Sequence, residues 1–308
     1  MVTLQNKVYY KSPLDFSVED LPSRTDPRKI VMASPDYFDI VDVKNVHMEG
    51  EKALDKQKAG KQWGNLKRIY EEWKALGAID EISILAGAEG CEDMVFAANQ
   101  SFPWLMGGGE KVVAMSKMKH SSRQKEVPFF EKFYKDQEYK TFHLNNTDLF
   151  EGMGDTIPHP VKNLLYGGYG HRSDPSAYEE LSVILNVPVI ALKLINEKFY
   201  HLDTCFLPLD EKTVMLCKEA FTDEGLELVY SLFRKVIEIP LSEAEKGFAL
   251  NAHIIHDSLS GHKLAVIHQG NDFTVAKLME NGFRVWELDT SEYMKSGGSV
   301  FCMKMMYY

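Results

Sequence analysis

Residues 264–288, LAVIHQGNDFTVAKLMENGFRVWEL, contain one complete structural module. The apolar run at 264–267 predicts a strand, the spacing of apolar residues over 272–281 predicts an amphipathic helix, and 283–288 predicts a second strand. A polar loop containing a glycine separates the first strand from the helix. This order of strand, loop, helix and strand is typical of an α/β fold.

The same order recurs along the chain, with a looser copy near the N-terminus. Strands are predicted at 29–32, 82–85, 111–115, 139–144, 163–166, 187–194, 213–217 and 236–239, and helices near 64–76 and at 121–134, 175–185 and 223–235. The loop after residue 166 is expected to run through Gly167, Gly168 and Gly170. Five modules at spacings of roughly 50 residues indicate a repeat architecture, in which each unit covers its apolar face with its neighbours. A closed ring around one central site and a doubly wound α/β sheet both fit this periodicity.

Composition excludes several classes of partner. The chain has 308 residues, is 44% hydrophobic and carries a formal net charge of −10 at pH 7. Nucleic acid and anionic membranes call for a basic face, so neither is expected as a partner, whereas an acidic surface tolerates a cationic small molecule. No apolar run is long enough to span a bilayer, and the N-terminal residues have no signal-peptide centre. We therefore expect a cytoplasmic protein, and the sequence leaves open whether it forms a homo-oligomer.

The four cysteines are Cys91, Cys205, Cys217 and Cys302. They form no CxxC pair and no dense framework, which argues against a disulfide scaffold and against a cysteine-rich zinc site. Free thiols in a reducing compartment fit this pattern better.

Cys302 follows the small residues Gly297, Gly298 and Ser299, which let backbone and substrate come close together. By itself, a cysteine in the apolar run 300–306 is more often a buried core residue than a nucleophile. His201 and Asp203 lie two positions apart, which in a strand places both side chains on one face. A histidine and a carboxylate on one face can transfer protons and bind a cation.

Two further segments carry polar groups. Glu151 and Asp155 surround Gly152 and Gly154, so two carboxylates are presented on a backbone that can bend tightly, or in a solvated turn. Residues 93–99 are read as a strand with Asp93 and Asn99 at its ends. The chain therefore offers a thiol, a histidine, carboxylates and an amide, without a phosphate-binding loop or a metal cluster. This inventory favours covalent cysteine catalysis on a cation.

These segments, in this order, resemble the guanidino-group-modifying (pentein) superfamily, which includes arginine deiminases, dimethylarginine dimethylaminohydrolases and amidinotransferases. Within it the sequence is most similar to the bacterial arginine dihydrolase type. The likeness runs from about residue 31 to the C-terminus. It is carried by DMVFAAN (93–99), RQKE (123–126), FEGMGD (150–155), GYGHRSD (168–174), FYHLDT (199–204) and GGSVFC (297–302).

The resemblance implies a five-bladed α/β propeller of ββαβ-type modules with pseudo-five-fold symmetry and a site at its centre. It thereby decides between the two architectures in favour of the ring. Residues 1–308 would form this single domain, with 1–28 as an N-terminal extension. No cofactor and no metal are implied, and the expected ligand is a cationic guanidino compound.

The resemblance also assigns roles to individual residues. Cys302 would be the nucleophile, His201 the general acid and base, and Glu151 the carboxylate that orients this histidine. The substrate-binding residues would include Asp93, with Asp203 as a ligand of the guanidinium. Arg123 and Arg172 would hold the substrate α-carboxylate, a role that suits a planar bidentate donor; as single residues, both also fit surface ion pairs.

Asn99 indicates the sub-type, because deiminases and dimethylarginine hydrolases carry an aspartate at the matching position. Asn45 resembles a second asparagine of the dihydrolase type, whereas Val46, His47 and Ala97 depart from that type. An amide can bind the neutral ureido group of citrulline, which an ionised carboxylate would bind poorly. The prediction is therefore an arginine dihydrolase that releases ornithine, carbon dioxide and ammonia. A deiminase or dimethylarginine hydrolase giving citrulline, an amidinotransferase and a non-enzymatic binding protein are the alternatives.

Overall fold

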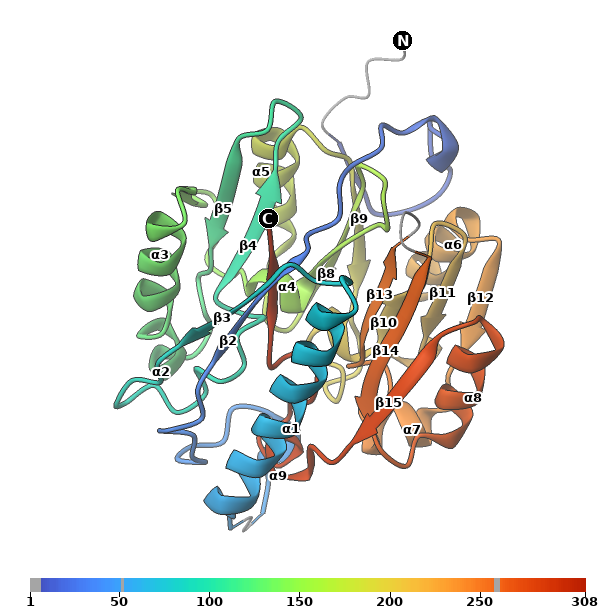
Figure 1. Ribbon diagram of the computed structural model, residues 1–308. Helices are drawn as coiled ribbons and strands as arrows, with labels where there is room; N and C mark the ends of the chain where they lie inside the picture. Colours follow the sequence, from blue (N-terminus) through green and yellow to red (C-terminus); the bar gives the residue numbers. More distant parts are fainter. Residues whose placement is uncertain (1–6, 51–52, 258–260) are drawn as a thin grey trace.

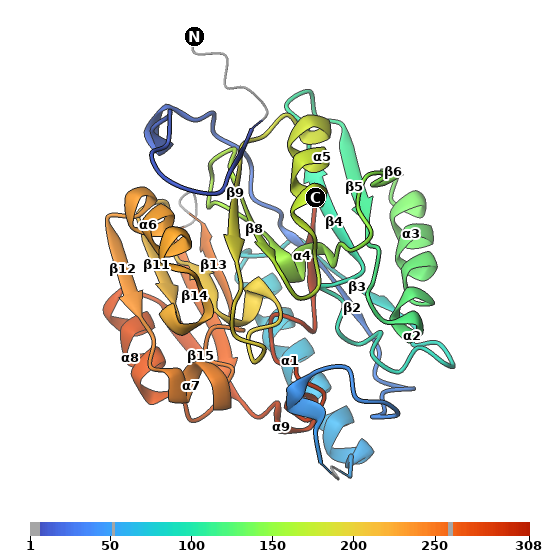
Figure 2. The same ribbon diagram turned by 180° about the vertical axis from the view of Figure 1, so that it is seen from behind.

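The computed structural model describes residues 7–50, 53–257 and 261–308, in which five small sheets surround the centre of the molecule (Figures 1 and 2). Every sheet repeats one pattern. Its first strand is antiparallel to the middle strand, and its last strand is parallel to the middle one. A helix connects the two parallel strands, as parallel pairing requires a long crossover. The five-bladed α/β propeller expected from the resemblance is confirmed.

The first three modules lie between residues 29 and 193. The first contains β2 (Lys29–Ala33), α1 (Lys56–Ala75) and β3 (Glu81–Leu85). The second contains β4 (Ser101–Leu105), β5 (Lys111–Met115), α2 (Ser121–Gln124), α3 (Val127–Asp136) and β6 (Lys140–His143). The third contains β7 (Thr156–Pro158), β8 (Leu165–Tyr169), α5 (Pro175–Leu185) and β9 (Val189–Lys193).

The last two modules follow the same order. The fourth contains β10 (Phe206–Pro208), β11 (Thr213–Leu216), α6 (Asp223–Leu232) and β12 (Lys235–Glu238). The fifth contains β13 (His253–Asp257), β14 (His262–His268), α8 (Asp272–Glu280) and β15 (Arg284–Leu288). Short helices lie outside the modules or in the loops within them: α4 (Gly152–Asp155), α7 (Leu241–Lys246), α9 (Ser291–Met294) and the 3-10 turns η1 (Val18–Asp20), η2 (Val46–Met48), η3 (Leu202–Thr204) and η4 (Lys218–Ala220).

The C-terminal strand closes the ring. β16 (Met305–Tyr307) supplies the antiparallel strand that the first module lacks, and it pairs with β2 so that Met305 lies opposite Val31. This strand is a fixed, buried anchor, and Cys302 lies three positions before it. At the other end of the chain, β1 (Val8–Tyr9) pairs in parallel with β9 and adds an edge strand to the third sheet.

Three local predictions are wrong. Residues 93–99 form consecutive turns before β4 begins at Ser101, not a strand. Gly167 and Gly168 belong to β8 instead of a loop, because the ring of Tyr178 on α5 packs directly against Gly167, where a Cβ would come within 2.6 Å of it. The single helix expected at 121–134 is divided into α2 and α3, since Pro128 starts a new helix.

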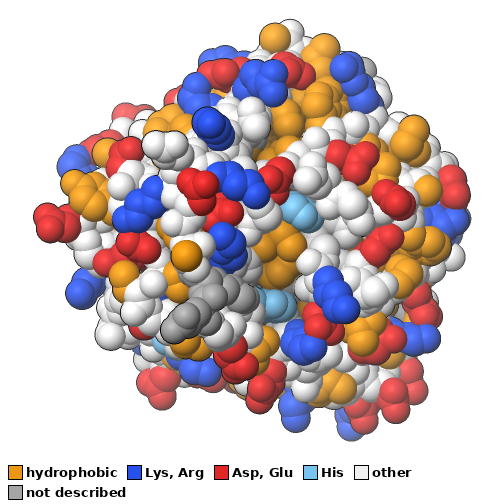
Figure 3. All heavy atoms as spheres, turned by 90° about the horizontal axis from the view of Figure 1, so that it is seen from below, with side chains coloured by type: hydrophobic (Ala, Val, Ile, Leu, Met, Phe, Trp, Pro, Cys, Tyr) orange, Lys and Arg blue, Asp and Glu red, His pale blue; other side chains and the backbone are white. Residues whose placement is uncertain are grey.

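The surface mixes both signs of charge. Seen from below, acidic and basic side chains are interspersed around a hydrophobic area near the centre of the face (Figure 3). The negative net charge is therefore not gathered on this side. Across the described ranges, no helix combines the length and the apolar composition that crossing a membrane requires.

Candidate active site

One narrow pocket brings together side chains from segments far apart in the sequence. It includes Asn45, Asp93, Asn99, Arg123, Arg172 and Cys302, all predicted as site residues, together with Lys44, Phe96, Tyr200, Ser296 and Gly298. The pocket encloses about 300 Å³ of empty volume, part of it open to solvent. The segments that carry these residues lie both within modules, as for Asn45 and Arg172, and between modules, as for Asn99 and Cys302. They meet because the five modules pack into a ring.

The thiol of Cys302 lies between a carboxylate and an amide. Its Sγ is 3.4 Å from Oδ2 of Asp203 and 3.1 Å from Nδ2 of Asn251. Burial raises the pKa of this thiol well above its ordinary value, and the negative charge of Asp203 acts in the same direction. Burial also raises the pKa of Asp203 to about 7, against the hydrogen bond from the thiol. A cation entering the pocket would favour the ionised forms of both groups.

Asn251 was not predicted from the sequence, although it makes four contacts around the thiol. Its Nδ2 also donates to the backbone carbonyl of Asp203 at 3.2 Å. Its Oδ1 accepts from the backbone N–H of Ser299 at 3.1 Å and of Cys302 at 3.3 Å. Asn251 therefore holds the Cys302 loop and the Asp203 turn together. A polar residue within the otherwise apolar stretch 248–252 is the only sequence signal that points to it.

His201 and Asp203 do not lie in a strand, so the predicted reason for their proximity is wrong. His201 has an extended backbone and precedes the 3-10 turn η3, which contains Asp203. The turn sends the Asp203 carboxylate to the thiol and the imidazole to Glu151. Both side chains are buried, at 2% and 1% exposure.

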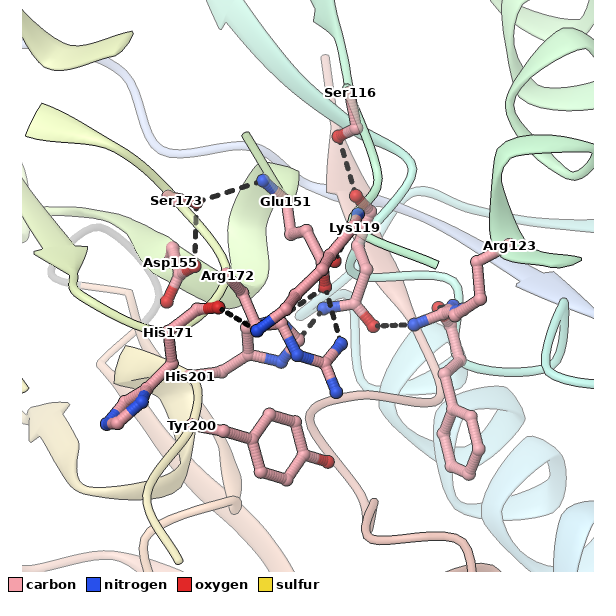
Figure 4. Close-up of polar contacts among 12 residues, drawn as sticks. Ser116, Lys119, Arg123, Glu151, Asp155, His171, Arg172, Ser173, Tyr200 and His201 are labelled. Carbon is pink, nitrogen blue, oxygen red and sulfur yellow. Dashed lines mark hydrogen bonds and ion pairs between the residues drawn. The ribbon is translucent and has the colours of Figure 1, made fainter. Parts of the chain in front are cut away.

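Glu151 joins His201 to Arg172. Its Oε2 lies 2.7 Å from Nε2 of His201 and 3.1 Å from Nη1 of Arg172, and its Oε1 accepts from the backbone N–H of Lys119 (Figure 4). Burial tends to raise the pKa of Glu151, but the charge of Arg172 and the hydrogen bond of His201 hold it well below its usual range. Glu151 is therefore ionised. Burial lowers the pKa of His201 to about 4 even though Glu151 opposes this, so the resting imidazole is neutral.

Asn99 lies on the other side of the imidazole. Its Nδ2 is 3.5 Å from Nδ1 of His201, and its Oδ1 accepts from Nη1 of Arg123 at 2.9 Å. With Nε2 donating its proton to Glu151, Nδ1 is the acceptor that faces the Asn99 amide. The imidazole thus has a defined tautomer, and the Asn99 amide has a defined orientation.

The two predicted arginines are both bound by glutamates. Arg123 donates to Glu126, which lies 3.0 Å from Nη2, and Arg172 pairs with Glu151. Arg172 also donates from Nη2 to the backbone carbonyl of Lys44 at 2.8 Å, and its guanidinium lies 4.8 Å from the centre of the Tyr200 ring. Burial raises the pKa of Glu126 to about 7, although Arg123 opposes this. The binding of Arg123 and Arg172 to a substrate carboxylate stays a prediction.

Asp93 and Asn45 lie at the rim formed by residues 42–48 and 296. Asp93 accepts from the hydroxyl of Ser296 at 3.0 Å and pairs with Lys44, whose Nζ is 3.0 Å from Oδ2. Asn45 donates from Nδ2 to the carbonyl of Ser296. The sequence did not point to Lys44, which lines the pocket while almost fully buried.

The arrangement suits nucleophilic and proton-transfer chemistry. The thiol of Cys302 lines the pocket. The carboxylate of Asp203 and the pair formed by ionised Glu151 and neutral His201 contact residues that line it. Within residues 7–50, 53–257 and 261–308, no group of three or more His, Cys, Asp or Glu side chains could hold a metal ion.

Comparison with known families gives a match over nearly the whole chain. The family model described as N,N dimethylarginine dimethylhydrolase, eukaryotic, matches residues 39–307. A bifunctional arginine dihydrolase/ornithine cyclodeaminase of Synechocystis is 30% identical over 91% of this chain, which corresponds to 38% of that protein's length. The N(G),N(G)-dimethylarginine dimethylaminohydrolase of Mycobacterium tuberculosis is 29% identical over 91% of this chain and 87% of its own.

Solved structures agree with these matches. The N-terminal domain of a cyanobacterial arginine dihydrolase of the ornithine-ammonia cycle, bound to its product, superposes with a TM-score of 0.81 at 30% identity. The superposition covers 91% of this chain and 97% of that domain. The matched region thus covers nearly the whole dihydrolase domain but only 38% of the length of the bifunctional Synechocystis protein.

Proposed function

The chain belongs to the N,N dimethylarginine dimethylhydrolase family, and we propose that it hydrolyses the guanidinium group of arginine through a covalent adduct on Cys302. As a member of this family it is a hydrolase of C–N bonds in guanidino compounds. The observation that carries the proposal is the position of Cys302 in the pocket, 3.4 Å from Asp203 and bordered by Asn99, which contacts His201.

Binding of the guanidinium prepares the thiol. A planar cation that pairs with Asp203 brings its positive charge next to Sγ, because the carboxylate and the sulfur are already in contact. The positive charge lowers the pKa of both groups, and the thiolate is the reactive form of cysteine. The thiol is thus inert in the empty pocket and becomes activated when its substrate binds.

The covalent adduct on Cys302 then forms and is hydrolysed. Cys302 transfers its proton to His201, Sγ bonds to the guanidinium carbon, and His201 returns the proton to the leaving nitrogen, which departs as ammonia. A water molecule then loses a proton to His201 and attacks the carbon of the thiouronium adduct. The C–S bond breaks, the sulfur is protonated again, and citrulline is released. Glu151 stabilises the imidazolium in both steps through its 2.7 Å contact with Nε2.

A second cycle converts citrulline into ornithine. Sγ attacks the ureido carbon, ammonia leaves, and water hydrolyses the S-carbamoyl adduct to a carbamate that decomposes to ornithine and carbon dioxide. To bind the neutral ureido group, the position of Asn99 must carry a neutral side chain instead of a carboxylate. Asn99 meets this requirement, and its contacts with Arg123 and His201 fix the direction of its amide.

Product analysis tests the proposal. The purified protein is incubated with arginine, citrulline, agmatine and asymmetric dimethylarginine, and amino acids, ammonia and dimethylamine are quantified. We expect arginine to give ornithine with two equivalents of ammonia. Cys302→Ser should abolish turnover, whereas Cys217→Ser, which changes a buried cysteine outside the pocket, should retain it. Citrulline that accumulates without ornithine would refute the dihydrolase assignment while leaving guanidino hydrolysis intact.

Hydrolysis of methylated arginine is the second candidate. The matching family model and the Mycobacterium tuberculosis relative both carry this activity in their descriptions. Release of dimethylamine from asymmetric dimethylarginine, at a rate above that on arginine, would favour it. An amidinotransferase would instead consume arginine only when an amine acceptor is present.

A further inference from the structure

Lys304 is a buried lysine close in sequence to the thiol of Cys302. It lies two residues after Cys302, its side chain is fully buried, and its Nζ lies 3.2 Å from the centre of the Phe301 ring. Within the described part of the chain, no hydrogen-bond acceptor is in reach of this Nζ. A buried ammonium group without an acceptor costs several kcal/mol of stability, so packing alone does not account for a lysine here.

Asp203, which contacts the thiol, also has a buried polar atom without a hydrogen-bond partner among the described residues. Its Oδ2 contacts Sγ, whereas its Oδ1 is buried and makes no hydrogen bond to any residue that the structure describes. Burial raises the pKa of Asp203 and the positive charge of Lys304 opposes this, while burial lowers the pKa of Lys304 and the negative charges of Asp203 and Cys302 oppose that. The ammonium, the carboxylate and the thiol are therefore electrostatically coupled. Burial, together with the charge of Lys304, lowers the pKa of His253 of β13.

We propose that Lys304 is a positioning residue whose positive charge stabilises the Cys302 thiolate when the bound substrate is neutral. The inference rests on the proposed function, because it concerns the second, citrulline-consuming half of that reaction. Lys304 would supply a positive charge, which Asn99 cannot, since an amide tolerates a neutral ligand but carries no net charge.

Counting charges explains why the two half-reactions differ. Attack requires the Cys302 thiolate beside the Asp203 carboxylate, which places two negative charges in a buried site. With arginine bound, the substrate guanidinium and Lys304 balance both. With citrulline bound, the ureido group contributes no charge, and the imidazolium formed on His201 is paired with Glu151. Lys304 is then the remaining partner of the thiolate and the Asp203 carboxylate. Unbalanced charge in a site of low polarity is strongly disfavoured, so removal of Lys304 should impair the citrulline step more than the arginine step.

The charge on Lys304 also depends on pH. Burial lowers its pKa to about 7, against the opposing effect of Asp203 and Cys302. Lys304 is charged below this pH and loses its proton above it. The difference between the wild-type protein and a variant without this charge should therefore be largest below about pH 7 and shrink as the pH rises.

The test compares Lys304→Met with the wild type on both substrates. We expect kcat on citrulline to fall about tenfold more than kcat on arginine, which corresponds to one unit in the thiol pKa, with KM little changed. Citrulline should then accumulate when arginine is supplied. Lys304→Arg keeps the charge and should restore the ratio of the two rates. Lys140→Met removes an exposed lysine, controls for net charge and should leave the ratio unchanged.

A second measurement does not depend on turnover. The rate at which iodoacetamide alkylates Cys302, followed by peptide mass spectrometry between pH 5 and pH 10, reports the fraction of thiolate. At pH 6, where Lys304 is charged, this rate should be about tenfold lower in Lys304→Met than in the wild type, and the difference should shrink as the pH rises. If the wild type stops at citrulline, the dihydrolase assignment fails and this measurement alone decides the role of Lys304.

Thermal unfolding separates positioning from packing. Replacing a buried charge by an apolar side chain of similar length should leave the melting temperature unchanged or raise it. Should Lys304→Met fail to fold, Lys304→Gln takes its place in both measurements. The proposal is overturned if both turnover rates fall equally together with the melting temperature, or if the alkylation rate at pH 6 and the ratio of the two turnover rates stay at the wild-type values.

Discussion

Asn251 donates a hydrogen bond from its side-chain amide to the sulfur of Cys302, with 3.1 Å between Nδ2 and Sγ. The same side chain binds two backbone N–H groups of the Cys302 loop and the carbonyl of Asp203. The position of the thiol relative to Asp203 thus depends on one buried amide, located 51 residues before Cys302.

Asn251→Ala should therefore lower both activity and stability. The substitution leaves buried backbone groups without partners, which costs on the order of 3 kcal/mol, and it frees the thiol from its fixed position. We expect kcat on arginine to fall at least about 100-fold, since small displacements of a nucleophile are costly. Asn271→Ala is the matched control: this buried asparagine binds backbone carbonyls of Gly247 and His268, so stability should fall while the activity of the folded fraction is kept. Equal activity in both variants would contradict the role given to Asn251.

Asn99→Asp should stop the reaction at citrulline. The new carboxylate would lie beside Nδ1 of His201 and bind Arg123, which already contacts Oδ1 of Asn99. A negative charge at this position favours a cationic guanidinium and disfavours a neutral ureido group. Quantified ornithine and citrulline after incubation with arginine give the result. Unchanged ornithine production would mean that Asn99 does not select the second substrate.

Gly154→Ala should inactivate the enzyme without a change in any polar group. A Cβ at this position would come 2.2 Å from Nδ2 of Asn99 and 3.4 Å from the imidazole of His201, so the amide or the imidazole must move. Gly64→Ala in α1 is the control, because no atom lies within 4 Å of its added Cβ. That variant should remain active and gain up to about 1 kcal/mol of stability from higher helix propensity. Initial rates and urea unfolding check both variants, and full activity of Gly154→Ala would show that the Asn99 contact is dispensable.

His159 should make the protein less stable in acid. Burial, together with the charge of Arg24, lowers its pKa to about 4, whereas an unfolded histidine titrates near 6.5. The unfolded state therefore binds a proton first as the pH falls, and stability is lost between about pH 6.5 and pH 4. For this one group the loss approaches about 3 kcal/mol at the lower limit.

Urea unfolding at pH 7.0 and pH 4.5 measures this effect. In His159→Gln the free energy of unfolding should depend less steeply on pH than in the wild type, because the amide does not titrate. His143→Gln, at a half-exposed histidine, controls for the substitution itself. Identical slopes in all three proteins would exclude His159 as a source of acid sensitivity.

Much of the fold could be predicted because its signals are local. The alternation of apolar runs and amphipathic helices repeats in each module and depends only on neighbouring residues, as in 264–288, where β14, α8 and β15 are observed. Local errors arose where tertiary packing decided, as at Gly167, which β8 retains because the ring of Tyr178 rests on it. The superfamily resemblance stated from six short motifs is confirmed by the family match.

The sequence by itself determined the modular α/β fold and which residue types could perform the chemistry, because periodicity and short motifs are properties of neighbouring positions. Only the tertiary structure decided which groups meet. His201 and Asp203 are two positions apart, yet η3 directs one to Glu151 and the other to Cys302. Asn251 carries no motif, and its place beside the thiol of Cys302 follows from ring closure by β16. Contacts between distant segments depend on how the five modules pack, which no local pattern encodes.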